Sequence, residues 1–207
     1  MSKAKLDGEG RVQRYLTANG LRVEGFTKTE MREGKTPDFR VFAGNELAFY
    51  CEVKTAQEDE RLDQQLAAVP PGTLAGGSRP DPTPNRVSNY IYSAVGQLDA
   101  VNPAIRLPNV LAIVNGDDGA GFTDLVQVLT GNAYCGGGEV VPNMFREYSE
   151  GRIREAKRRV HLYLWFNQRK AGDPQKFFPE VHPVHHAALC RHFSVNPGEL
   201  KGLPPTP

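Results

Sequence analysis

A chain of 207 residues with 39% hydrophobic and 24% charged residues has the composition of a globular domain and is too apolar to be disordered throughout. Its net charge of +1 excludes nucleic-acid binding through overall charge, so such binding needs a local cluster of basic residues. No apolar run is long enough for a membrane span, and three widely spaced cysteines favour a reducing compartment, so we expect a cytoplasmic protein with no membrane partner.

The first 69 residues predict three strands between two helices. Leu6–Asn19 has the apolar spacing of a helix and ends before Gly20, where a left-handed cap is expected. The three strands and the second helix are predicted at Leu21–Phe26, Asp38–Phe42, Leu47–Thr55 and Gln57–Val69. A polar loop through Lys35 separates the first two strands, and the short connection containing Gly44 predicts a hairpin between the next two.

The rest of the chain continues the alternation of helices and strands. A proline- and glycine-rich stretch, Pro70–Asn85, is expected to be an internal loop. Arg86–Val101 shows the most regular helical spacing, and Val110–Val114 is an apolar run typical of a strand covered on both faces. Further elements are predicted as a helix at Phe122–Leu129, a basic helix at Ser149–Arg159, a strand at Val160–Phe166 and a helix at Pro183–Phe193. Together these elements predict one α/β domain with a mixed central β-sheet flanked by helices.

Three charged residues of the hairpin carry a chemical pattern. Glu52 and Lys54 lie two apart in one strand, so their side chains project from one face, whereas Cys51 and Val53 project from the other. Asp38 begins the partner strand. Two carboxylates with an ammonium beside them suit phosphoryl chemistry, because hard oxygen ligands hold Mg²⁺ and a lysine offsets the charge that builds on the phosphate.

The motif Pro37-Asp38, followed after thirteen residues by Glu52-Val53-Lys54, resembles the PD-(D/E)xK nuclease superfamily. The order helix, strand, hairpin, helix, strand over residues 6–115 extends the resemblance, and residues 116–207 are expected to add helices and strands to the same domain. The resemblance implies a restriction-endonuclease-like fold and a nuclease that hydrolyses phosphodiester bonds in DNA with Mg²⁺, or with Mn²⁺ in its place. A homodimer is common among such nucleases.

The resemblance also implies a role for each matching residue. Asp38, Glu52 and the carbonyl of Val53 are the implied metal ligands, and Lys54 is the implied catalytic lysine. Glu9 on the first helix and Gln97 on the long helix match the positions of two further site residues.

Two surfaces are candidates for contact with a DNA backbone. Opposite the apolar stripe of the long helix, Arg86, Asn89 and Ser93 lie in line with Gln97. The second surface is the segment 146–170, where eight basic residues stand against three acidic ones. The phosphate contacts expected there are Arg152, Arg154, Lys157, Arg158 and Arg159.

Plainer explanations of these patterns stay open. The hairpin charges and both basic or polar surfaces are also explained as solvated faces, and the helix dipole alone favours Glu9 in a first turn. The alternative function is a catalytically inactive nucleic-acid-binding or assembly protein on the same fold. His182, His186 and Cys190 recur every four residues and could line a zinc-binding face, although no fourth ligand is evident.

The metal hypothesis also constrains the register of the hairpin. With a two-residue loop, Gly44-Asn45, and regular pairing, Asp38 would oppose Cys51 and point away from Glu52. An odd loop or a β-bulge restores the parity that places Asp38, Glu52 and Lys54 on one face. We therefore predict an odd loop or a bulge, and atomic coordinates test this directly.

Overall fold

The structure is a computed structural model that describes residues 7–56, 68–70, 72–73, 83–117, 119–134, 140–142, 153–168, 172–179 and 183–196. Most of the helix predicted at Gln57–Val69 and most of the loop predicted at Pro70–Asn85 lie outside the described residues. The first part of the basic helix predicted at Ser149–Arg159 lies outside them as well, and residues 153–157 of that segment are helical.

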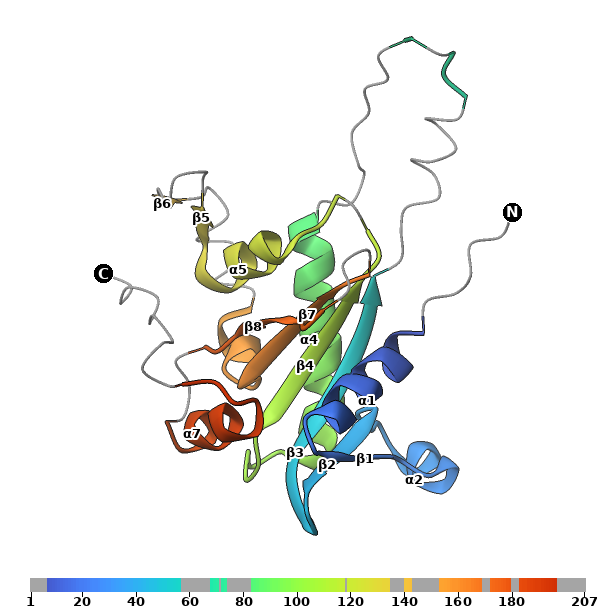
Figure 1. Ribbon diagram of the computed structural model, residues 1–207, viewed down its shortest axis with the longest axis vertical. Helices are drawn as coiled ribbons and strands as arrows, with labels where there is room; N and C mark the ends of the chain where they lie inside the picture. Colours follow the sequence, from blue (N-terminus) through green and yellow to red (C-terminus); the bar gives the residue numbers. More distant parts are fainter. Residues whose placement is uncertain are drawn as a thin grey trace.

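The centre of the fold is a six-stranded mixed sheet with the order β1-β2-β3-β4-β7-β8 (Figure 1). The strands are β1 (Arg22–Gly25), β2 (Phe39–Ala43), β3 (Glu46–Ala56), β4 (Asn109–Asn115), β7 (Leu162–Asn167) and β8 (Gln175–Phe177). Strands β3, β4 and β7 are parallel to one another, and the other pairs are antiparallel. Two short strands, β5 (Asn132–Tyr134) and β6 (Val140–Pro142), form a separate antiparallel pair. The predicted α/β class with a mixed central sheet is confirmed.

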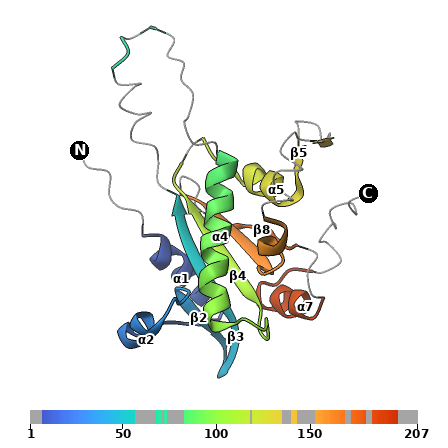
Figure 2. The same ribbon diagram turned by 180° about the vertical axis from the view of Figure 1, so that it is seen from behind.

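Helices cover both faces of the sheet. These are α1 (Gly8–Ala18), α4 (Thr83–Val101), α5 (Phe122–Thr130) and α7 (Pro183–His192). α1 and α7 share one hydrophobic cluster with the sheet, and α4 and α5 share the cluster on the other face, where Figure 2 shows α4 lying along the strands. Among the described residues, no helix combines the length and the apolar character that a membrane crossing requires.

Strand β4 is the middle of the core. All seven of its residues are buried. Val110, Ala112 and Val114 belong to the cluster under α1, while Leu111 and Ile113 belong to the cluster under α4. The prediction of a strand covered on both faces is confirmed, because alternate side chains of one strand fill the two cores in turn.

The segment predicted as a polar loop after β1 contains a short helix, α2 (Lys28–Glu33), so that prediction was wrong. A capping box begins the helix: the Thr27 hydroxyl accepts from the Glu30 N–H, and the Glu30 carboxylate accepts from the Thr27 N–H. No residue of α2 is buried. The helix therefore has no apolar periodicity to reveal it, and the Thr-x-x-Glu spacing was the available signal.

The β2–β3 hairpin contains the predicted bulge. Val41 pairs with Phe49 and Phe42 pairs with Leu47, so that Ala48 is an extra residue in β3. Because of this bulge Phe39 pairs with Cys51, and continuing the register by one residue places Asp38 opposite Glu52. The two-residue loop alone would have placed Asp38 on the face of Cys51.

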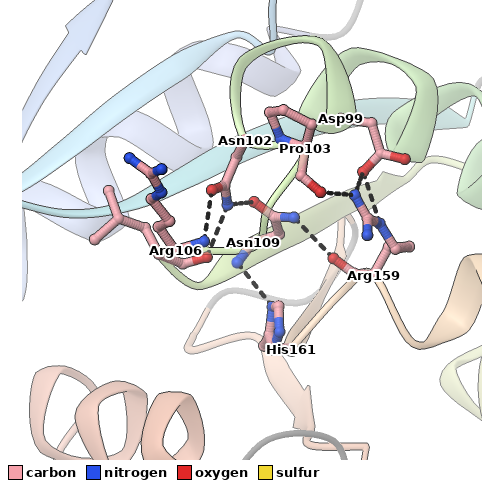
Figure 3. Close-up of polar contacts among 8 residues, drawn as sticks. Asp99, Asn102, Pro103, Arg106, Asn109, Arg159 and His161 are labelled. Atoms are coloured by element: carbon pink, nitrogen blue, oxygen red, sulfur yellow. Dashed lines mark hydrogen bonds and ion pairs between the residues drawn. The ribbon is translucent and has the colours of Figure 1, made fainter.

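A buried polar junction joins the amino ends of β4 and β7 to the end of α4 (Figure 3). The Asn109 N–H donates to His161 Nδ1 (2.9 Å), and its side-chain amide donates to the Arg159 carbonyl (2.9 Å) and accepts from Asn102 (2.8 Å). The Arg159 guanidinium reaches back to the Asp99 carboxylate with contacts of 2.6 and 2.8 Å. Asn109 has no exposed surface, so its N–H and its side-chain amide depend on these protein hydrogen bonds in place of water.

We predict that Asn109→Ala lowers the free energy of unfolding by about 1–3 kcal/mol, because it leaves buried partners without a hydrogen bond. Urea unfolding of the variant and the wild type measures the difference. The matched control is Asn89→Ala on the exposed surface of α4, which is expected to change stability by less than about 0.5 kcal/mol. Equal effects of the two substitutions would contradict a structural role for the junction.

Candidate active site

Asp38, Glu52 and Lys54 lie together at the point where β2 begins beside β3. The Asp38 carboxylate accepts the N–H of Val53 (2.7 Å), and the Asp38 N–H donates to Glu52 Oε2 (3.2 Å). Lys54 Nζ donates to the other oxygen of Glu52, Oε1, at 2.6 Å. The three side chains that the sequence suggested as a site are therefore neighbours, and both oxygens of Glu52 are engaged.

Gln97, on the helix α4 that covers this face of the sheet, completes the cluster. Its Oε1 accepts from Lys54 Nζ (2.7 Å), and its Nε2 donates to the Thr36 carbonyl (3.2 Å). One amide thus holds both the lysine and the segment that leads into Asp38. Sequence patterns indicated Gln97 but missed Thr36, because only a backbone carbonyl is involved and no side-chain pattern marks such a contact.

The backbone of Val53 also faces this cluster. In a strand, the N–H and C=O of one residue point to the same side, and those of the next residue point to the other side. The Val53 N–H points toward Asp38, whereas the Tyr50 N–H and the Ala56 carbonyl bond residues that flank β4. The Val53 carbonyl therefore points away from β4, toward the side where Asp38 precedes the first residue of β2.

Burial dominates the electrostatics of the two carboxyl groups. Glu52 is 1% exposed, and burial raises its pKa to about 8, with a further contribution from the charge of Asp38 and against the hydrogen bond and charge of Lys54. Burial also raises the pKa of Asp38, against the hydrogen bond from the Val53 N–H. The pair therefore retains a proton at neutral pH unless a further positive charge joins it.

The chemistry of this donor set fits a hard divalent cation. Asp38 and Glu52 offer carboxylate oxygens, and the Val53 carbonyl offers a third oxygen on the same side, which are the ligand types that Mg²⁺ and Mn²⁺ accept. A cation can take the place of a proton at this pair, because its positive charge offsets the repulsion between two ionised carboxylates. Lys54 lies beside these ligands and is not itself a ligand.

Glu9 belongs to a helix on the other face of the sheet. It is exposed in the first turn of α1, whose buried face packs on the side of the sheet that carries Cys51 and Val53. Within the described part of the chain, no group of three or more His, Cys, Asp or Glu side chains comes together as a metal site. The hydrogen bonds that join Asp38, Glu52, Lys54 and Gln97 do not involve Glu9. His182 of the suggested zinc face lies outside the described residues.

The polar face predicted on α4 divides into two parts. Asn89 and Ser93 are exposed, as a contact surface requires. Arg86 instead forms an ion pair with Asp117, which is 1% exposed and follows β4. Asp117 also accepts from the Gly119 N–H (2.9 Å), so Arg86 contributes to holding the segment that follows β4.

Most of the described basic residues of the predicted surface in segment 146–170 are engaged within the protein. Lys157 Nζ donates to the Leu129 carbonyl (3.0 Å) at the end of α5, and the Arg159 guanidinium binds Asp99. Arg158 pairs with Glu155 (3.2 Å) on the surface. Arg154 is exposed, and Arg152 lies outside the described residues. Sequence patterns could not reveal these partners, because the carbonyl of Leu129 and the carboxylate of Asp99 are distant in the chain.

The chain matches no family model, and no curated protein or solved structure is similar enough to count as a relative. A functional assignment therefore depends on the geometry and the electrostatics of the cluster formed by Asp38, Glu52, Lys54 and Gln97.

The buried carboxyl of Glu52 predicts a pH-dependent stability. Because the folded protein retains a proton on Glu52 that the unfolded chain releases, the free energy of unfolding should fall as the pH rises from about 4.5 to about 8. Glu52→Gln should flatten the profile in that window. Glu46→Gln, an exposed substitution in the same strand, is the control and should keep the wild-type slope. Chemical unfolding at a series of pH values measures this, and parallel profiles for wild type and Glu52→Gln would contradict it.

Proposed function

We propose that this protein is a metal-dependent nuclease that hydrolyses phosphodiester bonds in DNA, using Mg²⁺ or Mn²⁺. The observation that carries the proposal is the cluster of Asp38, Glu52 and Lys54, which combines the buried carboxyl group of Glu52, the half-buried one of Asp38 and the adjacent ammonium on one face of the sheet. The order α1, β1, hairpin, α4 and β4 agrees with the order that the PD-(D/E)xK resemblance implies, with α2 as an addition. A restriction-endonuclease-like fold is part of the proposal.

Each residue of the cluster has a distinct task in this proposal. Asp38, Glu52 and the Val53 carbonyl would hold the ion, which supplies a Lewis acid and a water molecule of lowered pKa. Lys54 orients the attacking water and offsets the negative charge that develops on the phosphate. Gln97 holds the lysine: its Oε1 accepts a hydrogen bond from Lys54 Nζ, and the hydrogen bond from its Nε2 to the Thr36 carbonyl fixes the orientation of the amide.

The desolvated environment strengthens these interactions. Lys54 is 18% exposed and Glu52 only 1%, so charge that develops beside them is poorly screened by water. An ordinary surface pair of Glu and Lys would not be buried in this way, since burial of a carboxylate is unfavourable unless another interaction offsets it. We therefore attribute the burial of Glu52 to function. The homodimer and the cytoplasmic location stay predictions from the sequence.

We predict that Asp38→Ala and Lys54→Ala each reduce cleavage of plasmid and single-stranded DNA on the order of 10²–10³-fold or more, because the first removes a ligand of the ion and the second removes positive charge beside the reacting phosphate. Product formation is measured with Mg²⁺, with Mn²⁺ and without metal. Glu46→Ala, which removes an exposed carboxylate from the same strand, should cleave like the wild type.

Three outcomes of this assay separate the proposal from its alternatives. Cleavage by the wild type that needs metal and is lost in both variants supports the nuclease. Wild-type protein that binds DNA but leaves it intact with either metal points to the non-catalytic binding protein on the same fold. Cleavage by Asp38→Ala or Lys54→Ala at the wild-type rate would remove the site assignment.

A further inference from the structure

α2 is fixed to the protein although it contributes nothing to the core. No residue of this helix is buried, and the capping box between Thr27 and Glu30 satisfies its amino end. Glu30 forms an ion pair with Arg40 of β2, and the Arg40 guanidinium lies over the Phe26 ring, 3.9 Å from its centroid. Polar and cation–π contacts, not apolar burial, thus set the position of α2 on the sheet.

The basic side chains of residues 28–35 differ from those predicted to contact DNA on α4 and in segment 152–159. Lys28, Arg32 and Lys35 are exposed, and within the described part of the chain the structure gives their charged groups no hydrogen bond or ion pair. Arg86, Lys157 and Arg159 by contrast already bind a carboxylate or a carbonyl. With Glu30 neutralised by Arg40, three free cations stand against one acid, Glu33, in residues 28–35.

The same segment leads directly into the cluster at Asp38. Lys35 precedes Asp38 by three residues, so their Cα atoms are at most about 11 Å apart. Between them, the Thr36 carbonyl is bound by Gln97, the residue that also holds Lys54. The free cations are therefore attached to the candidate active site by a short connection that is itself held in place.

We propose that Lys28, Arg32 and Lys35 bind the phosphate backbone of the DNA strand that enters the site at Asp38, an inference that rests on the proposed nuclease function. Within the described part of the chain these three cations have no ion pair to give up when they bind phosphates, and each phosphate they neutralise releases a counterion. The contact surface on the protein then lies on α2 and the residues after it, more than on the segment 152–159.

The test compares two variants with equal loss of charge. Arg32→Gln/Lys35→Gln removes two of the cations near Asp38, and Arg106→Gln/Arg191→Gln removes two exposed cations from the loop before β4 and from α7. Binding of a labelled single-stranded oligonucleotide and of a duplex is measured by fluorescence anisotropy across a salt series in EDTA, where no metal-dependent cleavage occurs. Metal-dependent cleavage by each protein is measured separately.

The first variant should bind more weakly, and the slope of log K against log salt should decrease by about 1.4 for the single strand and about 1.8 for the duplex, since two contacts are lost. The control should keep the wild-type slope, and both variants should keep the wild-type thermal stability. Equal slopes in the two variants, or no DNA binding by the wild type, would overturn the proposal for α2. If the wild type cleaves DNA but the two variants have equal salt slopes, the proposed nuclease function holds and the proposed contact by α2 does not. If the first variant has a smaller salt slope but no protein cleaves DNA, the contact by α2 is supported and the nuclease function is contradicted.

Discussion

The hydrogen bond from the Val53 N–H to the Asp38 carboxylate takes the place of the next rung in the ladder between β2 and β3. If β2 began before Phe39, a backbone carbonyl of that strand would accept the Val53 N–H, and the main chain of β2 would lie beside Val53. Because a side chain satisfies this N–H instead, the strand can turn away without leaving a buried donor unpaired. The same bond fixes the Asp38 carboxylate beside Glu52. One hydrogen bond therefore both ends the pairing of β2 with β3 and holds the cluster together.

Burial of these carboxyl groups is unfavourable for the folded chain by itself. Lys54 offsets part of the penalty for Glu52, and Gln97 in turn satisfies the lysine, so the polar groups form a chain that extends from β2 to α4. Chains of this kind are stable only when every member has its partner. The rest of the molecule provides the rigid support: β4 is buried on both faces beside β3, and the junction at Asn109 connects α4 to the strands.

Local patterns revealed much of this arrangement, because they depend on periodicity alone. The alternation of polar and apolar residues around Glu52 and Lys54 predicted which face of β3 these two residues share. The apolar run at Val110–Val114 predicted that β4 is buried on both faces. α2 was missed because six exposed residues have no apolar face. The partners of Arg86, Lys157 and Arg159 were missed for another reason: each is a matter of tertiary packing that no spacing in the sequence encodes.

The bulge at Ala48 decides on which face of the sheet Asp38 lies. Regular pairing of the same residues, continued from the turn without a bulge, would place Asp38 opposite Cys51 on the face under α1. Removal of Ala48 would also make the pairing regular, but Phe39 would keep Cys51 as its partner and Asp38 would stay opposite Glu52. The hairpin can therefore lose its extra residue and keep the cluster on one face, whereas a slip of the pairing by one residue would separate Asp38 from Glu52 without altering any residue of the cluster.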